Sequence, residues 1–446
     1  MWRRGFPHHR GCLRGVANQQ LFSTAPPVLS ATIRGGMAHD TNTPSATAPK
    51  TPVVLLVDLD AFFVSVERLD DPRLVGVPLV VAGEGPRSVV AAASYEARSY
   101  GIHSAMPLSA ARRRFSSLVV RPPRHARYRE VSEQVFDTVA GFAADLERAS
   151  IDEAYLTVPP HTDPSRTAHR IQAAVRDRHG ISCSVGGASN KLMAKIACET
   201  VKPGGVRVMA PHQELPLLLA LDVGDVPGIG AATAARLAEL GVETVADLAE
   251  LPEDELLERF GPARGGWLYA VARNELFDPV NSTPSPTKSI SLAETYPTDL
   301  TTSAEMAAAL EDLAARLWLR IIDDGRTPST FTVTARTSDF VTRSRSTTPA
   351  APPRSSAELA QLAHRLLDDL DVAQPTRLLG LSAERFRTVT QATLPFPDED
   401  GFVPGQEVYH AKFGRGRVLD LTSDSALVRF DDGSQLSILK EFLRPA

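Results

Sequence analysis

Short apolar runs alternate with amphipathic stretches along the first half of the chain. Residues 53–57 (VVLLV) form an uninterrupted aliphatic run that ends at Asp58, which is typical of a strand buried on both faces. The stretch 62–69 predicts a helix that stops before Asp70-Asp71-Pro72, and residues 77–82 predict a second strand. The alternation continues as helix, strand, helix and strand over residues 125–145, 154–158, 167–178 and 182–186. This pattern predicts an α/β or α+β core.

The second half of the chain contains three further segments. Residues 215–278 are rich in predicted helix, and the polar, proline-containing stretch 281–287 is typical of a linker. A second α+β domain is predicted after the linker. Its expected elements are a first strand, a helix at 303–322, two strands at 330–336 and 340–347, a helix at 356–370 and a last strand at 377–387. A proline- and acid-rich segment, 391–400, precedes a last alternating piece with a hairpin signal at Asp431-Asp432-Gly433.

Length and composition narrow the class of protein. At about 150 residues per domain, 446 residues correspond to roughly three domains. No apolar run approaches the roughly 18 residues that span a bilayer, so no membrane partner is expected. The three cysteines form no C-x-x-C pair, which favours a reduced, cytoplasmic protein. Because the formal net charge is −5, any contact with nucleic acid must be local.

Residues 1–50 lack a core pattern and are predicted to be a disordered extension. They are rich in arginine before the first acid, Asp40. Three interpretations are open: a transit-type leader, a twin-arginine export signal at Arg3-Arg4, or an upstream extension with the true start at Met37. Export is disfavoured because no apolar region follows, and the non-functional extension is preferred over the leader.

Carboxylates stand at the ends of two predicted strands. Asp58 follows the first strand, and Asp152 and Glu153 begin the strand at 154–158. If these strands are neighbours, the three carboxylates converge, and such a set is stable in its ionised form only when cations neutralise it. Oxygen ligands suit Mg²⁺, and two such ions support phosphoryl transfer. The alternative is that these are surface acids capping turns.

Five motifs occur in one order along the chain. They are D-x-D-x-F-F-x-S-V-E from Asp58, Y-E-A-R-S-Y-G-I from Tyr95, S-I-D-E-A-Y from Ser150, S-N-K-L-M-A-K-I-A from Ser189 and V-P-G-I-G from Val226. Together they resemble the translesion (Y-family) DNA polymerases over residues 52 to about 390. The resemblance implies a multidomain α+β right hand with palm, fingers and helical thumb and an α+β little finger, and a small C-terminal β barrel is expected after it.

The resemblance implies the following domain boundaries. The palm comprises 51–61 and 124–206, the fingers 62–123, the thumb with a helix-hairpin-helix 207–280, the linker 281–288, and the little finger 289–390. A clamp-binding tail follows at 391–400. Residues 401–446 resemble the SH3-like or Tudor-like module at the end of some bacterial repair helicases.

The resemblance also assigns the residues of the active site. Asp58, Asp152, Glu153 and the backbone carbonyl of Leu59 are the implied metal ligands, with Glu153 also catalytic, whereas Asp60 is a less certain ligand. Phe63 falls at the steric gate, where a flat ring under the sugar excludes a 2′-hydroxyl; the alternative is an ordinary core aromatic. Tyr95, Arg98 and Lys195 are the implied triphosphate contacts, and the alternative for each is a solvated helix face. Lys191 lies one turn before Lys195. Ala92 stands where many relatives carry threonine, so one hydrogen bond to the triphosphate is missing.

Contacts with DNA are expected in the thumb and the little finger. Gly228 and Gly230 allow a turn whose N–H groups point at a phosphate, although a plain helix-helix turn would need the same glycines. The predicted strands of the little finger carry arginines, and alternation places Arg343 with Arg345, and Arg385 with Arg387, on shared faces; the full set is Arg336, Arg343, Arg345, Arg385 and Arg387.

The tail carries a short peptide pattern. Gln391, Leu394 and Phe396 fit the Q-x-x-L-x-F motif that docks on the bacterial sliding clamp, and the alternative is a linker with incidental apolar residues.

The resemblance, together with the carboxylate pattern, implies a template-directed DNA polymerase that adds deoxynucleotides to a primer with two Mg²⁺ ions per active site, performing low-fidelity translesion synthesis. The expected partners are primed template DNA, deoxynucleoside triphosphates and the sliding clamp, and the expected state is a monomer in the bacterial cytoplasm, associated with the nucleoid. The alternative function is a catalytically weak, polymerase-like accessory protein recruited to the clamp.

Overall fold

A five-stranded sheet lies at the centre of the first part of the chain. The computed structural model describes residues 53–283, 286–370, 372, 375–387, 402–422 and 425–446. The sheet has the order β5-β6-β1-β7-β8, in which only the β7–β8 pair is parallel. Its strands are β1 (Val54–Leu59), β5 (Asp145–Arg148), β6 (Glu153–Thr157), β7 (Cys183–Ala188) and β8 (Val206–Val208). Every residue of β1 is buried, which confirms the strand buried on both faces that the aliphatic run predicted.

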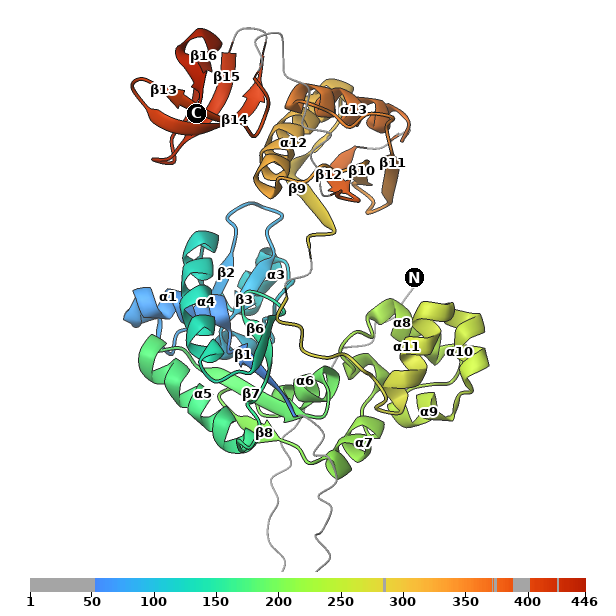
Figure 1. Ribbon diagram of the computed structural model, residues 1–446. Coiled ribbons are helices and arrows are strands. Elements are labelled where there is room, and N and C mark those ends of the chain that lie inside the picture. Colours follow the sequence, from blue (N-terminus) through green and yellow to red (C-terminus); the bar gives the residue numbers. More distant parts are fainter. Residues whose placement is uncertain (1–52, 284–285, 371, 373–374, 388–401, 423–424) are drawn as a thin grey trace, which may run out of the picture. The chain divides into compact units, whose positions relative to one another are not determined.

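Helices cover both faces of this sheet (Figure 1). Leu55 and Val57 of β1 face α4 (His125–Ala140) and α5 (Pro164–His179), whereas Val54 and Leu56 face α6 (Lys191–Glu199). Helix α6 approaches β7 very closely at Gly186, where an added Cβ would lie 2.4 Å from the amide nitrogen of Cys198. This glycine fixes the position of α6, and with it the side chain of Lys195, against the sheet.

A second, smaller sheet follows the first strand in sequence. It has the order β3-β2-β4, with β2 (Leu79–Ala82) antiparallel to β3 (Val90–Ala93) and parallel to β4 (Val119–Arg121). The predicted capping of the short helix by Ser94 is confirmed, because its Oγ accepts a hydrogen bond from the amide of Ala97 at 3.1 Å. The helices here are α1 (Phe62–Asp70), η1 (Pro72–Leu74), α2 (Tyr95–Ser99) and α3 (Leu108–Arg114).

The range 215–278, predicted to be rich in helix, contains a series of short helices that begins at Pro211 and ends at Ala272. The elements are α7 (Pro211–Leu219), η2 (Val223–Asp225), α8 (Ala231–Ala238), α9 (Val245–Glu250), α10 (Glu253–Phe260) and α11 (Pro262–Ala272). In the turn before α8, Gly228 has φ 96° and an added Cβ would lie 2.9 Å from the Trp267 ring, so only glycine fits this position.

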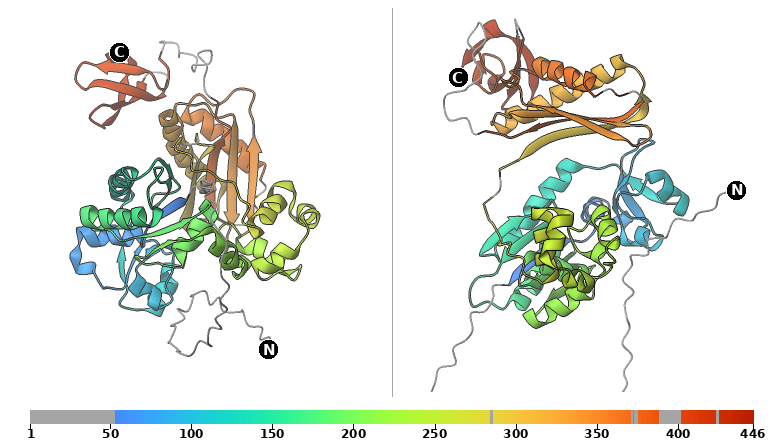
Figure 2. Two further views of the ribbon diagram at one scale, coloured as in Figure 1. Left: turned by 60° about the horizontal axis from the view of Figure 1, so that its bottom comes forward. Right: turned by 90° about the vertical axis from the view of Figure 1, so that its right-hand side faces the viewer.

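The second α+β unit is a four-stranded antiparallel sheet with two helices on one face (Figure 2). The strand order is β11-β10-β12-β9, and α12 and α13 pack their apolar sides on residues such as Phe331, Val333 and Leu381. The elements are β9 (Ser289–Leu300), α12 (Ser303–Asp324), β10 (Thr330–Thr337), β11 (Thr342–Thr347), α13 (Ser356–Asp368) and β12 (Thr376–Glu384).

The C-terminal residues form a separate antiparallel sheet with the order β16-β15-β14-β13-β17. The predicted hairpin is confirmed: the turn 431–434 joins β15 to β16, and Gly433 has φ 84°. The elements are β13 (Glu407–His410), β14 (Gly414–Leu421), β15 (Ser425–Phe430), β16 (Gln435–Leu439), η3 (Lys440–Phe442) and β17 (Leu443–Pro445). Within the described part of the chain, no pairing between β16 and β17 closes this sheet into the expected barrel.

The predicted α+β multidomain class is confirmed, with two corrections to the elements. The helix expected over 125–145 ends at Ala140, and β5 begins at Asp145. The strand expected to reach Arg387 ends at Glu384. In the described ranges, no helix combines the length and the apolar composition needed to cross a bilayer. The N-terminal extension and the whole of the segment 391–400, with Gln391, Leu394 and Phe396, lie outside the described residues.

Candidate active site

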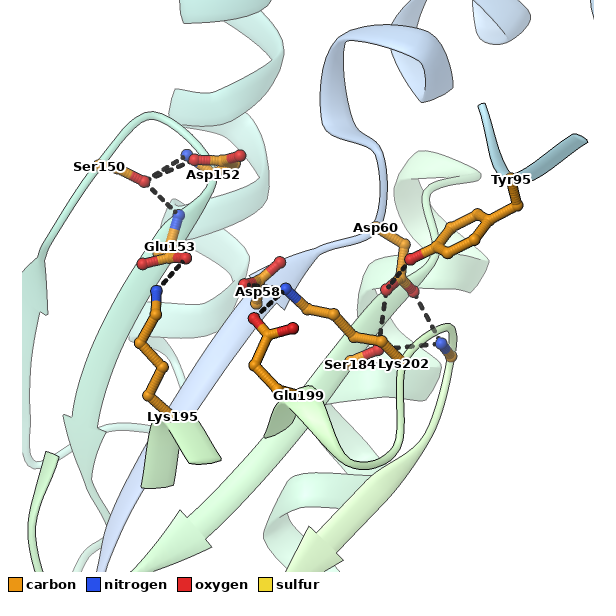
Figure 3. Close-up of polar contacts among 11 residues, drawn as sticks. Asp58, Asp60, Tyr95, Ser150, Asp152, Glu153, Ser184, Lys195, Glu199 and Lys202 are labelled. Carbon is orange, nitrogen blue, oxygen red and sulfur yellow. Dashed lines mark hydrogen bonds and ion pairs between the residues drawn. The ribbon is translucent and has the colours of Figure 1, made fainter. Parts of the chain in front are cut away.

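Asp58 and Glu153 face each other across two neighbouring strands (Figure 3). The strand β1 pairs with β6 in an antiparallel register that makes Asp58 the direct partner of Glu153. Side chains of direct partners project from the same face of a sheet, so the pairing brings the two carboxylates together. The condition on which the sequence prediction depended, that the two strands are neighbours, is therefore met.

The Asp58 carboxyl is unusually easy to protonate. The residue is only 5% exposed. Its burial, reinforced by the negative charge of Glu153 and opposed by the ammonium group of Lys202, raises the pKa of Asp58 to about 7. For Glu153, burial also disfavours ionisation, but the hydrogen bond and charge of Lys195, together with the hydrogen bond from Asp58 and the charge of Lys202, outweigh it and lower the pKa. Within the pair, Glu153 is therefore the more readily ionised carboxylate, and Asp58 the more readily protonated one.

Two lysines hold these carboxylates. The Lys195 Nζ donates to Oε1 of Glu153 at 2.6 Å, and the Lys202 Nζ donates to Oδ2 of Asp58 at 2.6 Å. Lys202 also reaches Oε1 of Glu199 at 2.7 Å, and its carboxylate partners raise its pKa although burial acts in the opposite direction. Each carboxylate thus has one cationic partner from the segment that contains α6 and the loop after it.

Asp152 lies beside this pair but its side chain has a different partner. Its backbone carbonyl accepts a hydrogen bond from the amide of Leu59 at 2.9 Å, and its Oδ1 accepts from the Ser150 hydroxyl at 2.5 Å. Among the side chains that the structure describes, no three histidine, cysteine or acidic groups are arranged to hold a metal ion. The structure therefore brings Asp58 and Glu153 together and places Leu59 and Asp152 next to them, without forming a finished three-carboxylate cage.

Asp60 is a structural residue in this geometry. It is 3% exposed, and its carboxylate accepts hydrogen bonds from the Ser182 hydroxyl at 2.6 Å, the Ser184 hydroxyl at 2.8 Å and the amide of Gly204 at 2.8 Å. The Tyr95 hydroxyl adds a longer bond at 3.4 Å. With its oxygens used in this way, Asp60 fixes the end of β1 to β7 and to the loop before β8.

Phe63 is supported by a second aromatic ring. It lies at the start of α1, half-buried, and its ring stacks on that of Tyr128 with centroids 4.2 Å apart and an interplanar angle of 14°. Tyr128 is itself fully buried and donates a hydrogen bond to Oε1 of Glu67 at 2.7 Å. This support holds the Phe63 ring in one orientation.

Of the other basic and aromatic residues considered for the nucleotide, Tyr95 and Arg98 contact each other, whereas Lys191 lies apart from the carboxylate pair. The Arg98 guanidinium lies over the Tyr95 ring, 4.5 Å from its centroid, so these residues share a helix face as expected. Burial, together with the nearby Asp60 charge, raises the pKa of Tyr95 to about 12, so its hydroxyl stays protonated at neutral pH. Lys191, one turn before Lys195, is buried and bound to Glu147 at 2.7 Å and Asp278 at 3.0 Å, and it does not join the carboxylate pair.

The arginines of the second sheet do not share one face. Arg343 and Arg345 lie opposite Ala335 and Val333, two buried residues that face the helices, whereas Arg336 belongs to the other face. Arg343 donates to the carbonyl of Leu370 at 3.4 Å, on the helix side. The expectation that Arg385 and Arg387 lie on one face of a strand is wrong, because the strand ends before them and Arg385 has φ 56°.

Two residues of the site were missed by sequence reasoning. For Lys202 the sequence offers only a weak signal. It lies one turn after the exposed Glu199, at the end of α6, but an acidic and a basic residue three positions apart are common on any helix. For Tyr128 the sequence offers no signal, because its contact with Phe63 depends on the packing of α1 on α4 and joins residues 65 positions apart.

The electrostatics of the pair can be measured directly. In the metal-free protein we expect the Asp58 carboxyl to titrate near pH 7, which carbon-13 NMR of labelled aspartate carboxyls detects. Glu153→Gln removes a neighbouring negative charge and should lower this pKa, whereas Lys202→Met removes a positive charge and should raise it. Asp58→Asn identifies the signal by removing it. A midpoint at about 4 that neither change moves would contradict the burial argument.

Three family models match the chain. The impB/mucB/samB family matches residues 57–199, its C-terminal domain residues 287–395, and the DNA polymerase-iota thumb domain residues 224–274. These ranges contain the carboxylate pair, the second α+β unit and the glycine turn, respectively.

Curated relatives share about a third of the sequence. DNA polymerase IV of Streptomyces coelicolor is 34% identical over 411 residues, which is 85% of this chain and 86% of that protein. DNA polymerase IV of Xanthomonas euvesicatoria is 39% identical over 360 residues, and DNA polymerase IV 2 of Mycobacterium tuberculosis is 36% identical over 337, each covering 97% of the relative.

Solved structures show the same fold. A Y-family DNA polymerase chimera of Dbh and Dpo4 superposes with a TM-score of 0.67 at 28% identity, over 76% of this chain and all of that one. An insertion ternary complex of Dbh DNA polymerase gives a TM-score of 0.53 at 28% identity, also over 76% of this chain and all of that one. By sequence over most of its length and by fold, the chain belongs to the impB/mucB/samB family of Y-family DNA polymerases.

Proposed function

We propose that this protein is a template-directed DNA polymerase that extends a primer with deoxynucleotides during low-fidelity translesion synthesis. The observation that carries the proposal is the pair of the buried Asp58 and the half-buried Glu153, which the β1–β6 register brings together beside Lys195 and Lys202. A negative site flanked by lysines suits a triphosphate bound through cations. The DNA polymerase IV relatives and the Y-family structures support this activity.

The donor set fits divalent cations. Two carboxylates that face each other, one with a raised pKa, gain stability in their ionised form when a cation binds between them. Asp58, Glu153, Asp152 and the carbonyl of Leu59 would hold the ions, which we take to be two Mg²⁺ because all the ligands are oxygen atoms. Bound there, the ions would supply activation of the primer hydroxyl and neutralisation of the leaving pyrophosphate. Lys195, now bound to Glu153, would then be available to a triphosphate oxygen.

The protein's own side chains position the nucleotide. Phe63, held by Tyr128, presents a flat surface to the sugar, and a 2′-hydroxyl would collide with it. Tyr95 and Arg98 present a hydroxyl and a guanidinium fork from α2 for the triphosphate. Asp60 keeps Tyr95 close to the end of β1.

We propose two contact regions for primed DNA. In the turn before α8, Gly228 with its positive φ and Gly230 at the helix N-cap present backbone N–H groups to a phosphate. In the second sheet, Arg336 on the open face, Arg343 and Arg345 on the edge strand β11, and Arg385 after β12 supply positive charge to the backbone. Such contacts are independent of base sequence.

The proposed chemistry predicts the effect of removing either carboxylate. Asp58→Ala or Glu153→Ala should lower the rate of magnesium-dependent primer extension by about 100-fold or more, because each removes charge that the transition state requires. Asp137→Ala, an exposed acid on α4, is the control and should leave the rate unchanged. Full activity of Asp58→Ala, or none in the unaltered protein, would favour the accessory-protein alternative.

Sugar discrimination provides a second test. Phe63→Ala should lower the preference for deoxynucleotides over ribonucleotides by roughly 100-fold in single-nucleotide insertion, since the ring forms the wall against the 2′-hydroxyl. Tyr128→Phe keeps the stacked ring and serves as the control, with discrimination unchanged. Phe63 has no such role if the Phe63→Ala protein discriminates as well as the unaltered one.

We also propose that the peptide around Gln391 docks on the sliding clamp. An extended segment can place one amide and two apolar anchors in a pocket. Replacing Gln391 and Phe396 by alanine should abolish pull-down by the clamp and leave primer extension without clamp intact. Thr393→Ala, at an unspecified position of the motif, is the matched control. Retained pull-down of the double variant would refute the assignment.

A further inference from the structure

Arginines gather on one face of the C-terminal sheet. In β13 and its neighbours, Tyr409 is the direct partner of Arg415 on one side and Arg444 on the other, and Glu407 is the partner of Arg417. Direct partners and alternate residues of one strand share a face. These residues therefore form one surface, the Tyr409 face, opposite the buried side that contains Val408, Val418 and Val428.

The Tyr409 face carries three arginines and one acid, Glu407, which is the direct partner of Arg417. Arg415, Arg417 and Arg444 are exposed, and within the described residues their guanidinium groups form no hydrogen bond or ion pair. Arg429, the partner of Arg417 on β15, is paired with Asp323 and is not counted in the surface. Asp431 borders the surface, since its amide donates to the carbonyl of Arg415 at 3.1 Å, and Asp432 lies in the β15–β16 turn. Like charges on adjacent positions of a sheet are unfavourable unless an anion binds them.

The aromatic residue lies in the middle of this charge. Tyr409 is 47% exposed, and its strand is an inner strand, with β14 on one side and β17 on the other. An exposed ring between two arginines offers a flat surface on which a nucleic-acid base can stack, while the guanidinium forks bind the flanking phosphates.

We propose that the Tyr409 face is a binding site for single-stranded nucleic acid, distinct from the polymerase active site. A base stacks on Tyr409, and Arg415, Arg417 and Arg444 contact the phosphates. Arg415 and Arg417 on β14 are about 6.8 Å apart, and Arg444 lies two strands from Arg415, about 9.6 Å away, so the three charges can follow a short extended backbone. An acidic peptide is disfavoured, because peptides that add to a sheet use an edge strand, and β13 and β14 are inner strands.

The site gives the C-terminal module a role that does not depend on the proposed chemistry. In a polymerase, single-stranded nucleic acid is the unpaired template, and binding it is separate from nucleotide addition. Binding is therefore measured with the full chain in EDTA, where no primer is extended.

The first experiment locates the site. Hydrogen-exchange mass spectrometry of the full chain with a deoxythymidine oligonucleotide should show protection of residues 406–418. The triple variant Arg415→Gln, Arg417→Gln, Arg444→Gln should lose this protection. In salt titrations, its slope of log K against log[salt] should be shallower by roughly 2, at about 0.7 per phosphate contact of a single strand.

The control variant changes the same charge elsewhere. Arg166→Gln, Arg170→Gln and Arg178→Gln alter three exposed arginines of α5 and should leave both the protection and the salt slope unchanged. Tyr409→Ala should weaken binding about 10-fold through lost stacking, whereas Tyr409→Phe keeps the ring and the affinity.

Three results would overturn the proposal. They are absence of protection at 406–418, equal behaviour of the two triple variants, and equal affinity of Tyr409→Ala and Tyr409→Phe. Protection of 406–418 by polyglutamate and not by the oligonucleotide would likewise overturn it and indicate a protein partner. Loss of primer extension on Asp58→Ala leaves every one of these readouts unaffected, so failure here and failure of the catalytic proposal are distinguishable.

Discussion

The antiparallel register of β1 and β6 is the constraint on which the active site depends. It sets Asp58 directly against Glu153, a pairing of like charges that a sheet ordinarily disfavours. The aliphatic residues of β1, buried on both faces, hold the strand in this register, because a slip of one residue would move every side chain to the opposite face. The free energy gained from the apolar packing of the strand therefore offsets the charge repulsion between Asp58 and Glu153 at its end.

Much of this arrangement could be predicted from the chain itself. The run before Asp58 and the acids before residue 154 predicted two strands with carboxylates at their ends, and Ser94 and Gly228 indicated a cap and a turn that the structure contains. Local patterns were sufficient here because each depends on neighbouring residues. The partner of a carboxylate depends on packing: Asp60 could not be separated from the ligand candidates by its position in D-x-D, and only its hydrogen bonds to Ser182, Ser184 and Gly204 identify it as structural.

The arginines of the second sheet show the same limit. Alternation correctly placed Arg343 and Arg345 on a common face, but it could not tell which face, since that depends on where α12 and α13 pack. The same alternation failed beyond Glu384, where Arg385 adopts a left-handed conformation and the period of two ends. The sequence of one strand predicts which residues share a face, but which of the two faces is covered by helices depends on the assembled sheet.

The hydrogen bonds of Asp60 connect the strand that carries Asp58 to Tyr95, one of the predicted nucleotide contacts. Through them the end of β1, the strand β7, the loop at Gly204 and the ring of Tyr95 share one small, rigid joint. A defect at this aspartate would resemble poor affinity for the incoming nucleotide, although the residue need never touch it. Inherited variation at this position would be misread as a change of substrate preference, although its origin is the loss of the hydrogen bonds that join β1 to β7, to the loop at Gly204 and to Tyr95.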